Sequence, residues 1–424
     1  MRYPSMRMSP QQKPGPQSAG TQLGVREVIA ILPLRRLTIA QVVSLFGDFL
    51  AIFGVFSIVS FRMHGSPAEV SGILLAYMLP QAFVGPMAGV LVDRWNIKWT
   101  MVASDLIRGV LVLALLRADA LWQIYAVMIG LSAIGAFFMP SQAIAIRSVV
   151  PTEGLVAANA LMMQTFQITQ IITPGIAGWL TGKLGETICF WLDSGSFVFS
   201  AAMVMSLAIA RKTAQGKAMG TMLSDLRDGV RFIFTHSTLA FTIISMAAGL
   251  FAVRCYSALI AVYVRDVLHA SQGLFGTLGT LVGVGMIIGT QIVTKLSKSR
   301  SKEHIMMGGL FMLAIGILFL ALIGTVPTTI LATVWMGVGV AMVIISAQTL
   351  MQGQTPMEMM GRVSSSSMSV MALAQAGGLM VSGSIAQMIG IRKSYLVTSA
   401  LLTVIAALGW RVVNKRAADR ALEA

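Results

Sequence analysis

Long apolar runs recur along almost the whole of this 424-residue chain, separated by short breaks that carry charges, Pro or Gly. The hydrocarbon core of a bilayer is about 30 Å thick, and an α-helix of roughly 20 apolar residues can cross it. The strands of a membrane β-barrel instead have about 10 residues of alternating polarity, whereas these runs are continuous. The sequence therefore predicts an all-α membrane protein with twelve transmembrane helices. The predicted spans are 37–60, 68–92, 100–116, 122–146, 155–180, 187–210, 239–263, 273–294, 304–324, 328–350, 362–389 and 394–411.

The charges are few and unevenly placed. Charged residues make up 11% of the chain, against about 25% in a soluble domain. The net charge of +15 would suggest a nucleic-acid partner in a soluble protein, but the basic residues gather in loops on one side of the predicted membrane. If the N-terminus is cytoplasmic, 23 of the 31 Lys and Arg residues lie on the cytoplasmic side and six on the other. The positive-inside rule then predicts a bacterial inner-membrane protein with both termini in the cytoplasm and no nucleic-acid partner.

One long internal loop divides the predicted spans into two groups of six. The expected organisation is a largely disordered cytoplasmic tail at 1–36, a first bundle at 37–210, a cytoplasmic linker at 211–238, a second bundle at 239–411 and a second tail at 412–424.

A weak internal repeat agrees with this division. Gly85-x-x-x-Gly89 recurs 200 residues later as Gly285-x-x-x-Gly289, Pro151 recurs 205 residues later as Pro356, and Gln142 recurs 206 residues later as Gln348. Together these matches indicate a parallel duplication, and hence two pseudo-symmetric six-helix bundles.

The loop after the second span carries a recognisable motif. Residues 89–98 read Gly-Val-Leu-Val-Asp-Arg-Trp-Asn-Ile-Lys, which resembles the signature G-x-L-x-D-R-x-G-R-K/R of the major facilitator superfamily and departs from it at Asn96 and Ile97. The resemblance implies the major facilitator fold and a cytoplasmic gate, in which Asp93 accepts hydrogen bonds from the free N–H groups at the start of the eleventh span. The predicted gate residues are Gly89, Asp93, Arg94 and Lys98 of this loop, with Asp105 and Arg108 of the third span.

Other stretches resemble the branch of the superfamily that contains macrolide and multidrug exporters, siderophore exporters and the lysophospholipid transporter. They are Phe46-Gly47-Asp48, Ser104 to Arg108, Met139 to Gln142, Ala158 to Leu161, Trp191 to Phe197 and Gly229 to Phe232. In the fifth span, Thr173, Pro174 and Gly178 lie in a stretch similar to the proton-antiporter signature G-x-x-x-G-P-x-x-G-G, with Thr and Ala replacing three glycines. Such residues allow a kink and close packing against the other bundle, although a proline kink also occurs without any antiport.

Ionisable groups inside the hydrocarbon are costly and mark candidate functional sites. Asp48, near the middle of the first span, is the candidate proton carrier; alternatively, a structural hydrogen bond or an arginine holds it. Arg254, midway along the seventh span, is expected to bind an anionic substrate, to neutralise Asp48 or to cap backbone carbonyls. Asp105 and Arg108, one helical turn apart, can pair with each other or with the loop residues.

Polar side chains mark a possible path for substrate. Gln164, Gln167 and Gln170 recur at intervals of three on the fifth span, and Gln348 and Gln375 lie on the tenth and eleventh. We predict that they line a cavity with Arg254, although side chains of this kind also hold membrane helices together. The four histidines form no cluster and no Walker-type loop occurs, so we expect no metal, no other cofactor and no ATP-driven step.

The sequence thus predicts a secondary active transporter rather than an enzyme. It is expected to export an amphipathic, drug-like molecule in exchange for protons by alternating access, as a monomer whose partners are its substrate, protons and membrane lipids. A facilitator that flips lysophospholipid or another lipid is the alternative. A membrane scaffold or an intramembrane enzyme is a further class, which the costly buried charges and the lack of converging catalytic groups disfavour.

Overall fold

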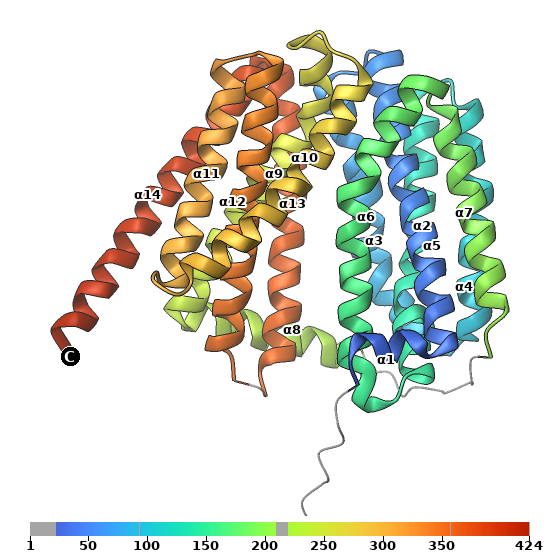
Figure 1. Cartoon of the computed structure of the whole chain (residues 1–424), viewed down its shortest axis with the longest axis horizontal. Helices are drawn as coiled ribbons and strands as arrows, with labels where there is room; N and C mark the ends of the chain where they lie inside the picture. Colours follow the sequence, from blue (N-terminus) through green and yellow to red (C-terminus); the bar gives the residue numbers. More distant parts are fainter. Residues whose placement is uncertain (1–22, 93, 209–218, 357, 424) are drawn as a thin grey trace, which may run out of the picture.

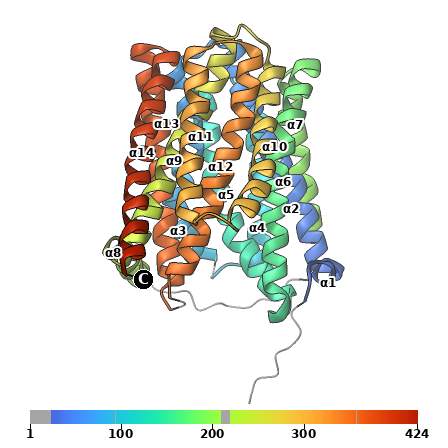
Figure 2. The ribbon, with the colours of Figure 1, turned by 60° about the vertical axis from the view of Figure 1, so that its left-hand side comes forward.

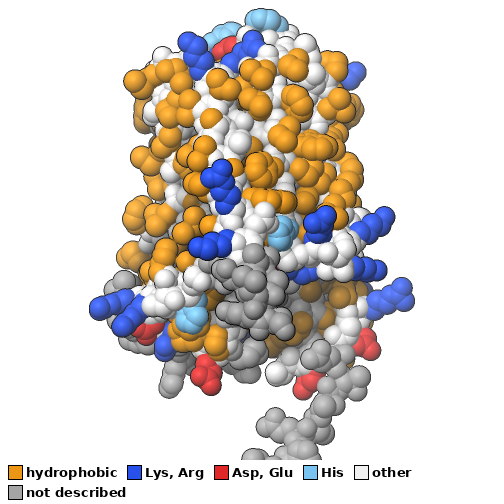
Figure 3. All heavy atoms as spheres, turned by 90° about the vertical axis from the view of Figure 1, so that its left-hand side faces the viewer, with side chains coloured by type: hydrophobic (Ala, Val, Ile, Leu, Met, Phe, Trp, Pro, Cys, Tyr) orange, Lys and Arg blue, Asp and Glu red, His pale blue; other side chains and the backbone are white. Residues whose placement is uncertain are grey.

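The protein is built from long helices that stand side by side (Figures 1 and 2). The computed structural model describes residues 23–92, 94–208, 219–356 and 358–423. Every regular element within these ranges is helical, and twelve of the helices are long and apolar enough to cross a membrane. On the face shown in Figure 3, hydrophobic side chains cover the middle of the molecule, and Lys and Arg gather mostly toward its lower end. The predicted all-α fold with twelve spans is confirmed.

Each predicted span corresponds to one helix. The first six are α2 (Leu32–Ser57), α3 (Pro67–Val92), α4 (Ile97–Leu113), α5 (Leu121–Val149), α6 (Leu155–Leu184) and α7 (Thr187–Met205). The second six are α9 (Ser237–Asp266), α10 (Gln272–Leu296), α11 (Lys302–Leu322), α12 (Val326–Gln354), α13 (Met360–Ile389) and α14 (Ile391–Glu423). Helices α2 to α7 pack on one another, as do α9 to α14.

Two short helices lie outside the spans. Helix α1 (Val25–Ala30) falls in the segment predicted as a tail, and α8 (Met219–Thr235) falls in the predicted linker. Helix α8 packs on α13, where Arg362 pairs with Asp228 at 3.4 Å. The predicted linker is therefore helical from residue 219 to 235; its residues 211–218 lie outside the described ranges.

The two bundles repeat each other at a constant offset. The first five spans begin at Leu32, Pro67, Ile97, Leu121 and Leu155, and their counterparts begin 205 residues later at Ser237, Gln272, Lys302, Val326 and Met360. Helices α6 and α13 both end at a glycine with positive φ, Gly185 and Gly390, again 205 residues apart. The duplication predicted from the sequence is therefore present in the fold, as Pro151 and Pro356 indicated.

The glycine pairs that suggested the duplication are not equivalent. At the offset of 205, Gly285 corresponds to Pro80 rather than to Gly85. Gly285 and Gly289 instead let α10 pack closely on α12, because an added Cβ on Gly289 would lie 2.7 Å from the carbonyl oxygen of Val338. The predicted equivalence of the two glycine pairs was wrong.

The bundles meet at one end of the molecule, away from α1 and the last turns of α14 (Figure 1). There the rings of Phe53 (α2) and Phe275 (α10) stack with centroids 4.5 Å apart. Gln272 donates a hydrogen bond of 2.8 Å to Glu186. Arg265, near the end of α9, donates to two backbone carbonyls of the first bundle, those of Ser60 and Gly65. We call this the closed end.

At the other end, which carries α1 and the C-terminus (Figure 1), the bundles part. Ser71 of α3 lies at the closed end, in contact with Gly383 of α13. Gly85 and Gly89 lie further along α3 on the same helix face, because a helix returns to one face every three or four residues. An added Cβ on Gly85 or Gly89 would meet nothing within 4 Å, and neither would one on Gly361 at the start of α13. We call this the open end.

Candidate functional site

A buried ion cluster occupies the interior of the first bundle. Arg108 of α4 pairs with Asp48 of α2, Nη1 to Oδ2 at 3.4 Å, and its Nη2 donates to Oδ1 of Asp105 one turn earlier on α4. The guanidinium carbon also lies 4.3 Å from the ring centre of Phe197 and 5.2 Å from that of Phe138, where aromatic faces attract a cation. Asp48 has 16% of its side chain exposed, against 6% for Arg108 and none for Asp105, so Asp48 is the member of this trio that solvent reaches most easily.

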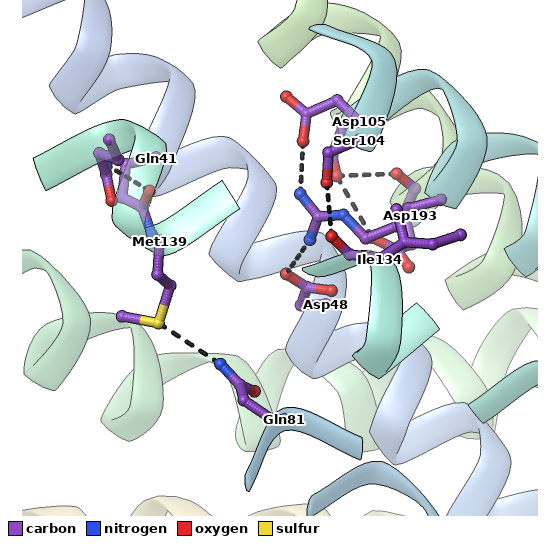
Figure 4. Close-up of polar contacts among 11 residues, drawn as sticks. Gln41, Asp48, Gln81, Ser104, Asp105, Ile134, Met139 and Asp193 are labelled. Atoms are coloured by element: carbon purple, nitrogen blue, oxygen red, sulfur yellow. Dashed lines mark hydrogen bonds and ion pairs between the residues drawn. The ribbon is translucent and has the colours of Figure 1, made fainter. Parts of the chain in front are cut away.

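Asp193 of α7 joins the same region, as Figure 4 shows. It is 1% exposed, and Ser196 donates a hydrogen bond of 3.4 Å to its Oδ1. Its carboxyl packs on the backbone of Gly47, where an added Cβ would lie 2.5 Å from Oδ1. Gly47 is required here because α2 and α7 approach so closely, and this approach places Asp193 beside the residue that precedes Asp48.

The cluster holds three carboxyl groups around one guanidinium. The second oxygens of Asp105 and Asp193, and Nε of Arg108, have no hydrogen-bond partner among the described residues. With every group ionised, the cluster would carry a net charge of −2 inside the bundle. Charge of this kind at membrane depth is costly.

The second bundle lacks this cluster at the equivalent positions. At the offset of 205, Asp48 corresponds to Val253, Asp105 to Leu310, Arg108 to Leu313 and Asp193 to Thr398. Leu310 and Leu313 are fully buried in the apolar core. Within the described residues, the cluster of three carboxyl groups around one guanidinium therefore occurs in the first bundle alone.

Arg254 of α9 has a different environment from Arg108. Its Nε donates a hydrogen bond of 2.8 Å to Oε1 of Gln375 on α13, and α13 can approach α9 this closely because Gly378 has no side chain. Asp48 is thus paired with Arg108, and the alternative that Arg254 neutralises Asp48 is wrong in this structure. Arg254 and Gln375, which were both predicted to line a substrate cavity, are thus in direct contact.

The glutamines of α6 lie on the open-end side of the contact between the bundles. Pro174 and Gly178 pack against Gly279 and Gly276 of α10, and Gln164 and Gln167 continue this face toward the open end. Their side chains are exposed, as is that of Gln170, whereas Thr173 is fully buried. Gln348 of α12 is also exposed. No described contact joins Gln348 to the other predicted cavity residues.

The predicted gate residues do not form one group. Asp105 and Arg108 lie in the ion cluster, whereas Arg94 is exposed on the loop and Lys98 is partly buried in the first turn of α4. Asp93 lies outside the described residues. Gly89 is on the face of α3 that has parted from α13. The role of these residues in a gate stays a prediction.

Sequence reasoning missed Asp193 as a member of the cluster. The signal was present, because Asp193 is one of the few ionisable residues inside the predicted spans. A carboxyl this close to the expected outer end of its span is equally compatible with a structural cap or an outer-gate contact, so the sequence pattern alone does not assign it to the cluster. Among the described residues, no three His, Cys, Asp or Glu side chains gather as a metal site would require.

Twelve spans in two duplicated bundles, closed together at one end and parted at the other, define a helical membrane transporter. The sequence profile of the Major Facilitator Superfamily matches residues 37–378, and the chain belongs to this family.

Several bacterial relatives are similar along most of the chain. YfiS of Bacillus subtilis, an uncharacterised MFS-type transporter, is 25% identical over 394 residues, covering 91% of this chain and 94% of the relative. The multidrug efflux pump Tap of Mycolicibacterium fortuitum is 23% identical over 359 residues, 81% of this chain and 87% of Tap. Macrolide efflux protein A of Streptococcus pyogenes is 23% identical over 353 residues, 81% of this chain and 86% of that protein.

Solved structures share the fold. A point mutant of the nucleoside transporter NupG superposes with a TM-score of 0.70 at 14% identity, covering 90% of this chain and 99% of NupG. A bacterial homologue of the human lysosomal transporter Spinster, in an inward-facing and unoccupied conformation, also gives a TM-score of 0.70, at 13% identity and 90% and 96% coverage. At these identities the likeness concerns the fold.

Proposed function

We propose that this transporter exports an amphipathic small molecule across the bacterial inner membrane in exchange for protons. The observation that carries the proposal is the cluster of Asp48, Asp105 and Asp193 around Arg108. Because one guanidinium balances only one carboxylate, charge balance favours protons on the remaining carboxyl groups, and a change of conformation that alters the cluster changes how many protons it holds.

Asp48 is the proposed entry point for the proton. Asp48 is the most exposed of the paired residues in the cluster. Its ion pair with Arg108 joins α2 to α4, whereas the pair of Asp105 with Arg108 lies within α4. A proton on Asp48 weakens the ion pair that joins α2 to α4, which couples protonation to the packing of these helices.

The direction of transport and the substrate class rest on other support. Tap and macrolide efflux protein A are exporters by name. The excess of Lys and Arg on the side of the termini favours a cytoplasmic location for both termini. With that orientation, the open end faces the cytoplasm and the structure is the state that loads substrate for export. We further propose that the protein works as a monomer, because both of the bundles that alternating access requires lie in one chain.

Proteoliposomes with an imposed pH gradient test the proposal. The probes are erythromycin, ethidium and dodecanoate, each measured for accumulation with and without the gradient. We expect Asp48→Asn to lose gradient-driven accumulation while retaining its melting temperature. The matched control is Asp119→Asn, an exposed carboxyl in the loop before α5. Accumulation that ignores the gradient in the native protein, or that survives in Asp48→Asn, would contradict proton coupling through this cluster.

A further inference from the structure

Helix α8 (Met219–Thr235) differs from the twelve spans in its direction. In Figure 1 it lies crosswise at the open end, whereas the spans stand side by side. It packs on α13 and on α9, which begins at Ser237, two residues after α8 ends. The proposed proton cycle gives this helix no role.

One face of α8 is docked on the second bundle. Ser366 of α13 donates a hydrogen bond of 3.0 Å to the backbone carbonyl of Leu226. An added Cβ on Gly229 would lie 2.8 Å from the carbonyl carbon of Arg362, so the two backbones are in close contact. Ile233 is fully buried in an apolar cluster with residues of α9 and α13. Leu226, Gly229 and Ile233 recur at intervals of three and four residues and form a single helix face.

These contacts also fix the depth of α8. Arg362 and Ser366 belong to the first two turns of α13, whose apolar span runs over Met360–Ile389. The apolar span of α9 begins at Ser237, next to the end of α8. Since both spans enter the hydrocarbon from this level, α8 lies beside the headgroups of the leaflet at the open end.

The opposite face of α8 is basic and exposed. Arg227, Arg231 and Phe234 are all exposed, and their intervals of four and three residues place them together on the side away from α13. Phe234 is 56% exposed. Neither arginine makes an ion pair among the described residues, and the carboxylate of Asp228 beside them is paired with Arg362 at 3.4 Å. The described part of this face therefore presents two positive charges without a partner, next to an exposed aromatic ring.

Charge complementarity identifies the partner of this face. A free amphipathic helix buries its apolar face between lipids, but α9 and α13 already cover the apolar face of α8. Attraction between the arginines and anionic headgroups is the remaining force, and it acts within a Debye length of about 8 Å at physiological ionic strength. Phe234 adds apolar contact area at headgroup level, as aromatic residues do on interfacial helices.

We propose that the outer face of α8 binds the anionic phospholipid headgroups of the leaflet at the open end, with Arg227 and Arg231 on the phosphates and Phe234 among the headgroups. The two arginines stand one helical turn apart, so both can reach the same headgroup. The partner is the bilayer surface rather than free phosphate, because Phe234 offers a soluble anion nothing to bind. The proposal holds whatever the substrate, the coupling ion and the direction of transport are.

A fluorescent label beside this face tests the proposal in the full-length protein. Thr235→Cys places a bimane label on an exposed residue at the end of α8, and the native Cys189 and Cys255 are buried. The protein is placed in nanodiscs of phosphatidylcholine with a small fraction of phosphatidylglycerol, and one of the two lipids carries bromine on its acyl chains. Because bromine quenches a fluorophore that it contacts, we expect brominated phosphatidylglycerol to quench the label more, mole for mole, than brominated phosphatidylcholine.

Removing the charge sets the size of the effect. Arg227→Gln with Arg231→Gln is expected to lower the preference for phosphatidylglycerol by about 30-fold, because each basic side chain near an anionic surface contributes roughly a fivefold preference. Both side chains lie on the face away from α13, so the docking contacts of α8 are untouched. Arg227→Lys with Arg231→Lys keeps the charge and is expected to retain most of the preference. The matched control, Lys298→Gln with Arg300→Gln, removes the same charge from the exposed loop between α10 and α11 and is expected to change nothing.

Two further measurements separate the aromatic and electrostatic parts. Phe234→Ser is expected to weaken quenching by both lipids and to leave their ratio unchanged. Raising the ionic strength from about 0.1 M to about 1 M, which shortens the Debye length from about 10 Å to about 3 Å, is expected to lower the preference in the native protein.

Equal quenching by the two brominated lipids in the native protein, or a preference that survives Arg227→Gln with Arg231→Gln, would overturn the proposal. A label that neither lipid quenches would place α8 away from the bilayer and would overturn it as well. Millimolar inorganic phosphate is expected to leave the preference in place. A preference that phosphate abolishes would assign the arginines to a soluble anion and reject the bilayer as their partner.

Discussion

Adding one methyl group to the contact between α6 and α10 should shift the conformational balance of the transporter. Gly276 of α10 packs against α6 so closely that an added Cβ would lie 2.6 Å from the Cα of Gly178. The atoms of α6 that the added Cβ would meet all belong to the backbone of Pro174 and Gly178, so α6 cannot move a side chain aside to relieve the overlap. Gly276→Ala therefore penalises the conformation in which the bundles meet at the closed end.

Overpacking of this kind costs about 1–3 kcal/mol, which corresponds to a roughly 5- to 150-fold change in the ratio of two conformations. The contact forms only when the bundles meet at the closed end, so the penalty falls on this state and spares the alternative. We expect the population to shift toward the state open at that end.

Distances between spin labels measure this shift. One pair, at Glu153 and Gln352, spans the open end, and another, at Asp119 and Thr325, spans the closed end; all four side chains are exposed or partly exposed. The native Cys189 and Cys255 are buried, which directs the labels to the introduced cysteines. In Gly276→Ala the first distance should shorten and the second should lengthen.

The control lies on the facing helix. Gly182→Ala adds the same methyl group to α6, one turn beyond Gly178, where a Cβ would meet nothing within 4 Å. It also corrects for the gain in helix propensity of about 1 kcal/mol that alanine brings over glycine. The same shift in both variants, or in neither, would refute the steric reasoning.

Three further outcomes follow from the structure. Arg108→Gln leaves the buried carboxylates without a cation and should destabilise the protein by about 3–5 kcal/mol, visible as a lower melting temperature; an unchanged value would contradict the ion cluster. Gly47→Ala should destabilise by about 1–3 kcal/mol because its methyl group would overlap Asp193, whereas Gly195→Ala, with nothing within 4 Å, should stabilise by up to about 1 kcal/mol through helix propensity. Alkaline phosphatase fused after the C-terminus should be inactive, and active when inserted after Gly185, if both termini are cytoplasmic; the reverse pattern would invert the proposed orientation.

The positions of the spans followed from the sequence because hydrophobic length is a local property. The predicted span 68–92 became α3 (Pro67–Val92), and 362–389 became α13 (Met360–Ile389) despite its many Ser and Gly residues. Helix α8 was missed because its alternating polar and apolar faces lower its mean hydropathy, and a search for continuous apolar runs passes over such a segment. The constant offset of 205 was only partly visible in the sequence, because Pro151 and Pro356 repeat at this offset whereas the glycine pairs do not, and the helix starts that carry it throughout are known only from the structure.

The partner of Asp48 could not be predicted in the same way. The extent of an apolar run shows how deep a charged residue lies along its own helix. By this measure Arg108 and Arg254 are alike, because both lie within spans. Which of them reaches Asp48 depends on which helix faces are neighbours, a property of the packing of α2, α4 and α7. The same reason explains Asp193: it was placed within its span, but only Gly47 and the close approach of α2 and α7 bring it to the cluster.

The lone guanidinium of Arg254 has an electrical consequence. If it binds an anion, the empty protein carries a positive charge near mid-membrane that a monovalent ligand cancels. A charge that crosses the whole membrane field responds with about 2.3 kcal/mol per 100 mV, and a partial crossing responds in proportion. With the proposed orientation, a negative cell interior would stabilise the cytoplasm-open state of the empty protein. Once an anion is bound, the site is neutral and the voltage no longer favours that state. The resting voltage would then return the unloaded transporter to the loading state without any dedicated voltage sensor.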